Sequence, residues 1–82
     1  MISIQVKFFG PVRDIVGADE LTMSLPDQCT GEALLQTLMN RHPRLGEWSS
    51  SLRLAVNLEY AHIGRVLEDA DEVSFIPPVS GG

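Results

Sequence analysis

Only one long stretch of this 82-residue chain has the apolar periodicity of an amphipathic helix. The apolar residues of that stretch recur at helical spacing between Thr30, an expected N-cap, and Pro43, which is expected to end the helix. The other apolar residues alternate with polar ones in short runs, as strands with one buried face do. Because one helix can cover only one sheet, the pattern predicts an α+β domain with one main helix on one mixed sheet.

Five short segments carry the strand pattern, and the order along the chain is predicted to be β-β-α-β-β-β. The short connection after the first segment favours an antiparallel pairing with the second. Between them, residues 12–16 are expected to form a short helical turn closed by Gly17. Residues 43–51 are expected to be a loop in which Trp48 covers the core. The predicted strands span residues 2–8, 20–25, 52–56, 60–61 and 73–76.

Length and charge exclude several classes of function. A domain of 82 residues buries roughly 60–65% of its unfolded surface and has no room for a deep cleft, so its chemistry requires a larger partner. The net charge of −5 opposes binding to a phosphate backbone, which argues against nucleic acid as a ligand.

The sequence also indicates a cytoplasmic protein. No apolar run approaches the ~20 residues of a membrane helix, and the first residues lack a basic start and apolar core typical of a signal peptide. A single cysteine, Cys29, cannot form an internal disulfide, which fits a reducing compartment.

Two large apolar residues break the strand alternation. By parity, Phe9 lies on the outer face of the first strand and Ile76 on the outer face of the last. If these strands run parallel and adjacent, the two side chains meet at one end of the sheet, where the C-terminal segment begins. Either the side chains curl into the core or are ordinary scattered apolar residues, or they form a docking patch for a partner.

The chain is predicted to divide into a domain of residues 1–76 and an extended tail, residues 77–82, with the sequence Pro-Pro-Val-Ser-Gly-Gly. Two prolines make a stiff spacer, and six extended residues reach about 20 Å. Gly81 and Gly82 have no Cβ, so their backbone can thread a narrow channel. The alternative is a frayed end, as most termini are.

The terminal carboxylate of Gly82 needs a leaving group before its acyl group can be transferred to a nucleophile. Adenylation supplies AMP as the leaving group, and a sulfur nucleophile can then displace it to give a thioester or a thiocarboxylate. The ATP site would lie in a separate activating enzyme, and this chain would supply only the acyl group.

Other chemistry has weaker support. Cys29 precedes the helix but has no histidine close to it in sequence, so we expect a small buried residue. His42 and His62 have no metal-ligand spacing, so no metal site is expected. The acidic run over residues 68–72 is expected to be a solvated turn, with a contact to a basic partner as the alternative.

Several segments together resemble the small subunit of molybdopterin synthase, the MoaD family. The resemblance spans nearly the whole chain. It is carried by Phe-Phe-Gly-Pro-Val-Arg-Asp-Ile-Val-Gly at residues 8–17, Ala-Val-Asn-Leu-Glu-Tyr at 55–60, Asp-Glu-Val at 71–73 and Pro-Pro-Val-Ser-Gly-Gly at 77–82.

The resemblance implies a ubiquitin-like β-grasp fold and a role as a sulfur carrier that is not an enzyme on its own. An adenylating enzyme similar to ubiquitin-activating enzymes would use ATP on the C-terminal glycine, and a sulfurtransferase would make a thiocarboxylate. The synthase large subunit would pass that sulfur to cyclic pyranopterin monophosphate to build the molybdopterin dithiolene. The assembly would be a heterotetramer of two small and two large subunits, with no resident cofactor.

Individual residues follow from the resemblance. Gly82 would carry the sulfur, and residues 78–81 would enter the partner's active site, namely Pro78, Val79, Ser80 and Gly81. Docking would use Phe9, Tyr60 and Ile76. Arg13 matches a recurrent basic position to which no role is assigned. Ala70 departs from the glycine frequent in the family.

Three other functions share these features. The chain could carry sulfur for thiamine, cysteine or tRNA thiolation, it could be a ubiquitin-like modifier conjugated to lysines, or it could be a binding module with an inert tail. The Pro-Pro-Val-Ser spacer favours molybdopterin synthesis.

Overall fold

The computed structural model describes residues 1–78, and the remaining tail residues, 79–82, lie outside the described part. The predicted order of strands and main helix is confirmed, as is a short helix after the first strand. The elements are β1 (Ile2–Phe8), α1 (Gly10–Val16), β2 (Glu20–Leu25), α2 (Gly31–Arg41), the 3-10 helix η1 (Pro43–Glu47), β3 (Arg53–Val56), β4 (Glu59–Ala61) and β5 (Glu72–Ile76).

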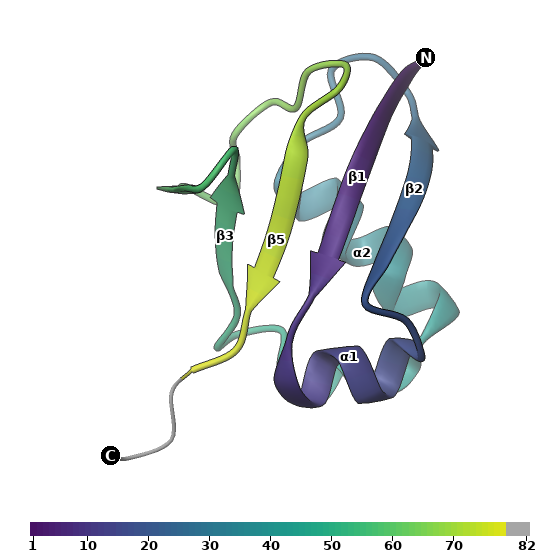
Figure 1. The fold of residues 1–82 in the computed structure, drawn as a ribbon, viewed down its shortest axis with the longest axis vertical. Helices are drawn as coiled ribbons and strands as arrows, with labels where there is room; N and C mark the ends of the chain where they lie inside the picture. Colours follow the sequence, from purple (N-terminus) through teal and green to yellow (C-terminus); the bar gives the residue numbers. More distant parts are fainter. Residues whose placement is uncertain (79–82) are drawn as a thin grey trace.

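The five strands form one mixed sheet in the order β2-β1-β5-β3-β4 (Figure 1). β1 pairs with β2 as the predicted antiparallel hairpin, and it pairs with β5 in parallel. β3 lies antiparallel to both β5 and β4. The two strands that are farthest apart in sequence therefore occupy the centre of the sheet, and α2 crosses behind one of its faces.

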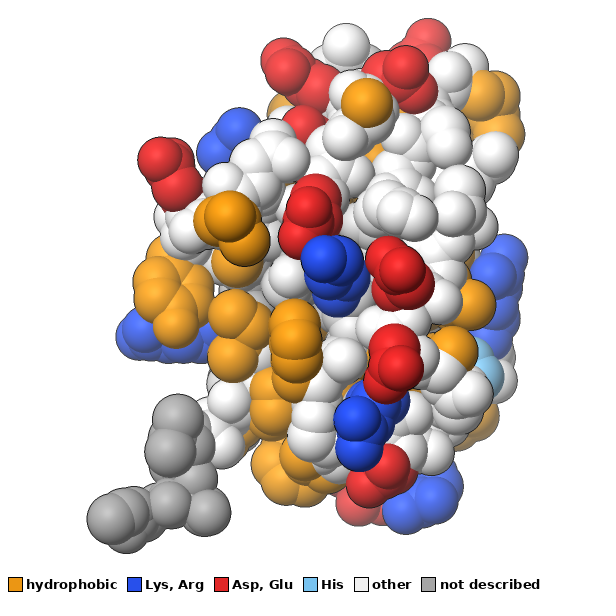
Figure 2. Space-filling view, in the orientation of Figure 1, with side chains coloured by type: hydrophobic (Ala, Val, Ile, Leu, Met, Phe, Trp, Pro, Cys, Tyr) orange, Lys and Arg blue, Asp and Glu red, His pale blue; other side chains and the backbone are white. Residues whose placement is uncertain are grey.

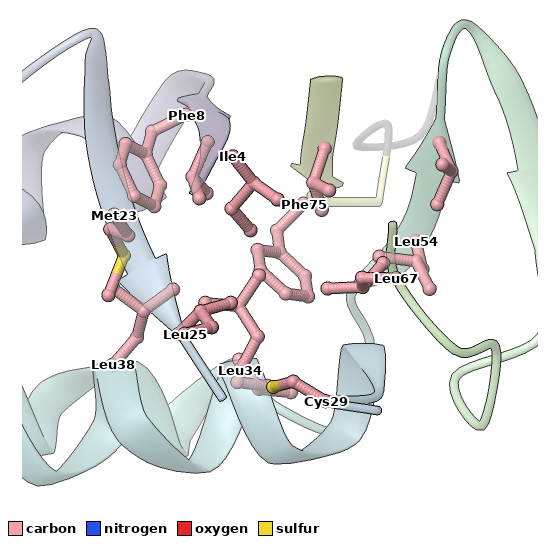
Figure 3. Close-up of a cluster of buried hydrophobic side chains, with 14 of the residues drawn as sticks. Ile4, Phe8, Met23, Leu25, Cys29, Leu34, Leu38, Leu54, Leu67 and Phe75 are labelled. Carbon is pink, nitrogen blue, oxygen red and sulfur yellow. The ribbon is translucent and has the colours of Figure 1, made fainter. Parts of the chain in front are cut away.

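The core lies between α2 and the inner face of the sheet (Figure 3). Phe8 of β1 and Phe75 of β5 are register partners, and both are fully buried there. Leu34 and Leu38 project from α2 toward them. The period of two along the strands and of about 3.6 along the helix places both apolar sets in the same layer.

α2 begins and ends where its sequence predicts. Thr30 is the N-cap, and its hydroxyl oxygen accepts a hydrogen bond from the backbone N–H of Ala33 at 3.1 Å. Glu32 lies in the first turn, where the helix dipole favours a negative charge. The helix ends at Arg41, directly before the His42-Pro43 step.

The expected loop over residues 43–51 is partly wrong. Residues 43–47 form η1, because proline at the first position of a helical turn already has a helical φ and loses no needed donor. Leu45 from this turn is fully buried, whereas Trp48 is half-buried and does not belong to the core cluster. Leu45, not the predicted Trp48, closes this side of the core.

Neither helix in the described part of the chain is long and apolar enough to cross a membrane.

Candidate functional site

The parallel pairing of β1 with β5 brings the two out-of-pattern residues together. Phe8 is in register with Phe75, so Phe9 and Ile76 follow at the same end of the two strands. Phe9 is 47% exposed and Ile76 is half-buried, and both line one shallow hollow on the outer face of the sheet. The predicted meeting of these residues at the start of the tail is confirmed. Neither side chain enters the core cluster.

This hollow is the centre of an apolar surface that we call the outer patch. Figure 2 shows a group of apolar side chains on this face, next to the point where the chain leaves the domain. The hollow has a volume of about 250 Å³. The outer patch consists of Phe9, Ala55, Leu58, Tyr60, Ser74 and Ile76.

The patch has a floor of small residues and a rim of large ones. Ala55 and Ser74 are register partners on β3 and β5, and they are only 7% and 8% exposed although they lie on the outer face. At the rim, Tyr60 is 67% exposed and Leu58 is 88% exposed. Small side chains flanked by large ones create a shallow apolar depression on the outer face of the sheet.

Sequence reasoning missed three members of the outer patch. The sequence pattern assigns no docking role to Leu58, which lies between two strands, or to Ser74, which faces outward by strand parity. Strand parity places Ala55 on the outer face. A leucine in a two-residue turn is an apolar residue that cannot reach the core, so Leu58 is expected to be exposed. Those two signals were available in the sequence and identify the hairpin as part of the surface.

The β3–β4 hairpin that presents Leu58 and Tyr60 has a tight turn. Asn57 and Leu58 both have positive φ, 52° and 70°, which matches a two-residue hairpin turn with left-handed central residues. Asparagine tolerates this conformation, whereas leucine is disfavoured in it. The left-handed turn that exposes Leu58 is therefore maintained by contacts between the hairpin and another segment of the chain.

Those contacts come from the connection that precedes β5. The Asn57 side-chain amide donates to the Asp71 carboxylate at 3.0 Å, and the Asn57 side-chain oxygen accepts from the Glu72 N–H at 3.0 Å. The second Asp71 carboxylate oxygen accepts from the Glu68 N–H at 2.8 Å. Asp71 is 6% exposed, so the prediction of a solvated acidic turn is wrong at this residue. A buried carboxylate needs such partners, and here it ties the hairpin to β5.

The tail leaves the domain next to the outer patch. After Ile76, Pro77 is half-buried and Pro78 is exposed. Pro77 packs against Gly10, since a Cβ placed on Gly10 would lie 3.5 Å from the Pro77 ring. Gly10 has a φ of +55°, which favours glycine at the turn between β1 and α1. The predicted site residues Val79, Ser80, Gly81 and Gly82 lie outside the described residues.

The other half of the outer face is charged. Lys7 pairs with Glu72 at 3.0 Å, and Arg13 pairs with Asp19 at 3.5 Å. The hydrogen bond that the Lys7 ammonium group donates to the Glu72 carboxylate, together with the negative charge of that carboxylate, raises the pKa of Lys7. The apolar outer patch over β3, β4 and β5 therefore lies beside a charged area, in which Lys7 of β1 pairs with Glu72 of β5 and Arg13 of α1 pairs with Asp19 (Figure 2).

The weaker candidates have structural roles. Cys29 is buried, and its burial raises the pKa of the thiol, which opposes thiolate chemistry. The His62 Nδ1 atom accepts a hydrogen bond from the Gly64 N–H at 3.0 Å. Within residues 1–78, no three His, Cys, Asp or Glu side chains are arranged to hold a metal ion.

The fold places the chain among ubiquitin-like β-grasp proteins. A ubiquitin from Caldiarchaeum subterraneum, at 14% identity, covers 99% of this chain and 98% of its own with a TM-score of 0.63, a similarity of fold alone. A molybdopterin converting factor subunit 1 from Pyrococcus furiosus superimposes with a TM-score of 0.86 at 28% identity, covering 96% of this chain and 100% of that chain.

Sequence comparison narrows the class to one family. The ThiS family model matches residues 6–82, so the chain belongs to the ThiS family. Relatives described as molybdopterin synthase sulfur carrier subunits include one from Escherichia coli, 40% identical over 96% of this chain and 99% of the relative. Another, from Caenorhabditis briggsae, is 37% identical over the full length of both chains.

One similar structure contains a partner. It is a complex of subunits 1 and 2 of the molybdopterin-converting factor from Helicobacter pylori. It matches with a TM-score of 0.68 at 26% identity, over 99% of this chain and 100% of that chain.

The hydrogen bond between Asn57 and Asp71 leads to a prediction about the free energy of unfolding of the domain. Replacing Asp71 by alanine leaves the Asn57 amide and the Glu68 N–H without their acceptor, so we expect a loss of about 1–3 kcal/mol in the free energy of unfolding. Urea unfolding measures it. The control is Asp14→Ala, which removes an exposed carboxylate 4.0 Å from Arg13 and should change stability by less than about 0.5 kcal/mol. Equal losses in the two variants would contradict the structural role of Asp71.

Proposed function

We propose that this chain is the sulfur carrier subunit of molybdopterin synthase. One observation carries the proposal: the outer patch lies next to the point at which the Pro77-Pro78 segment leaves the domain, so a partner that covers the patch receives the tail at a fixed place. Full-length similarity to relatives with that description supports the assignment.

The chemistry takes place at the terminal carboxylate of Gly82. An adenylating enzyme uses ATP to form an acyl-adenylate with release of pyrophosphate. The persulfide of a sulfurtransferase then attacks the carbonyl carbon and AMP leaves, which gives an acyl disulfide. A thiol reduces this disulfide, so that the thiocarboxylate is released and the thiol becomes part of a disulfide on the donor. Gly81 and Gly82 carry no Cβ, so two enzymes in turn can approach this carbonyl closely.

Sulfur transfer requires the synthase large subunit. Pro78, Val79, Ser80 and Gly81 extend into its active site, where the thiocarboxylate sulfur attacks cyclic pyranopterin monophosphate. Water then hydrolyses the thioester between Gly82 and the pterin, which leaves the sulfur on the pterin and a carboxylate at Gly82. Two such transfers build the dithiolene, and each carboxylate must be loaded again. The small chain supplies the acyl carrier and the large subunit supplies the catalytic groups, in keeping with a domain too small for a deep cleft of its own.

Docking on the large subunit uses the outer patch. Phe9 and Tyr60 present large apolar surfaces at its rim, and Ile76 continues it to the start of the tail. Aromatic side chains around a small hollow are the usual anchors of protein interfaces. The assembly is a heterotetramer of two large and two small subunits in the cytoplasm, with no cofactor bound to the small chain.

Deletion of Gly82 tests the carrier role. We expect sulfur transfer to cyclic pyranopterin monophosphate to fall to background, because the truncated tail no longer places its terminal carbonyl in either enzyme. Assembly with the large subunit and the melting temperature should stay unchanged. The readout is dithiolene formed by the reconstituted synthase. Undiminished dithiolene formation by the truncated chain would favour a binding module with an inert tail.

Phe9→Ala tests the docking surface. Truncating this rim aromatic removes a well-placed anchor, so affinity for the large subunit should fall by roughly 1–3 kcal/mol in calorimetric titration. The matched control is Val66→Ala, since Val66 is also apolar and 45% exposed but lies outside the outer patch. If Phe9→Ala binds as tightly as Val66→Ala, Phe9 is not part of the interface.

A further inference from the structure

Arg53 lies at the edge of the outer patch and is not explained by the apolar docking surface. It is the first residue of β3 and the register partner of Ile76, which is the last strand residue before the tail. Its side chain is exposed, and its guanidinium carbon lies 5.3 Å from the centroid of the Tyr60 ring. The cation–π contact fixes the guanidinium at one wall of the patch.

Two other basic residues near the outer patch are already neutralised. Lys7 is paired with Glu72, and Arg13 is paired with Asp19 and Asp14. Among the ion pairs within residues 1–78, none includes Arg53. In a chain of net charge −5, Arg53 is therefore a positive group without an ion-pair partner among the described residues.

A cleft of about 430 Å³ opens beside Arg53 at the β4 edge of the sheet. Tyr60 lines both this cleft and the hollow of the outer patch, so the two depressions lie on either side of a shared aromatic residue. The side chains of Arg53, Tyr60, Ala61 and His62 border the cleft. Figure 2 shows basic side-chain atoms directly against the apolar group at the outer edge of this face.

A guanidinium stacked on an aromatic ring is suited to carboxylate recognition. Its planar donors match the two oxygens of a carboxylate, and the cation–π contact with Tyr60 favours a guanidinium position beside the cleft before a ligand arrives. Pre-organisation lowers the entropy lost on binding. The apolar patch beside it selects a protein surface over a small anion, because a partner that covers the patch also removes water from the cleft.

We infer that Arg53 and the cleft beside Tyr60 extend the docking surface as a charge-recognition site, which takes an Asp or Glu side chain of the large subunit. This inference rests on the proposed function, since the partner is the one that covers the outer patch. The apolar patch supplies contact area, whereas Arg53 fixes the orientation of the partner around the tail and discriminates against surfaces without an acidic group at that place.

Titrations of the large subunit with charge variants, at low and high salt, test the inference. Arg53→Glu should lower the affinity about tenfold at low salt and flatten its salt dependence, because one attractive pair becomes a repulsive one. Arg53→Lys should keep the wild-type salt dependence. The control Arg44→Glu makes the same charge change on η1, outside the patch and the cleft, and should alter affinity by less than about twofold.

Two results would overturn the inference. One is an Arg53→Glu variant that binds like Arg44→Glu. The other is an Arg53→Ala variant that binds more weakly with an unchanged salt dependence, which would mean that Arg53 only supports the Tyr60 ring. The Phe9→Ala titration distinguishes failure of the charge-recognition site from failure of the proposed docking surface. Loss of binding in Phe9→Ala with normal binding in Arg53→Glu removes only the charge site, whereas normal binding in Phe9→Ala removes Phe9 from the docking surface whatever the charge variants show.

Discussion

The parallel pairing of β1 with β5 determines where the functional groups of this protein lie. Adjacent strands are about 4.8 Å apart, so two parallel strands that end together place the residues after them side by side. Burial fixes the register, because Val6 and Phe8 pair with Val73 and Phe75 on the inner face. A shift by one residue would move this whole set to the outer face. Phe9, Ile76 and the first tail residue are therefore held together by the core.

The outer face combines an apolar patch with a charged area. Large side chains such as Leu58 and Tyr60 are exposed to solvent in the free chain, and their burial favours association with another protein. Ion pairs beside the patch and the net charge of −5 oppose self-association. If the large subunit docks on the outer patch as proposed, this division would direct the tail toward the partner.

Most of the fold follows from periodicity in the sequence. Alternation predicts the strands and their inner faces, the Thr30 cap and Pro43 bound the main helix, and parity identifies Phe9 and Ile76 as outward residues. These features depend on residues close in the chain, or on the assumption that the first and last strands are neighbours. The predicted anchor Tyr60 also lines the same hollow.

Features that depend on contacts between distant segments were not predictable. The acidic run of residues 68–72 has the composition of a solvated turn, and only its position beside Asn57 makes Asp71 a buried acceptor. Ser74 is polar and outward, yet it is covered because Ala55 lies opposite and large rim residues surround both. The stacking of Arg53 on Tyr60 depends on the β3–β4 register, which no local pattern specifies.

The central claim is that this domain exists to present a C-terminal acyl group for loading with sulfur. Intact-mass spectrometry of the protein after incubation with ATP, the adenylating enzyme and a sulfur source tests the claim most directly. The account predicts a chain whose mass rises by the replacement of one oxygen by one sulfur, with the change located at Gly82. An unchanged mass in the complete mixture, or an isopeptide link between Gly82 and a lysine, would contradict it.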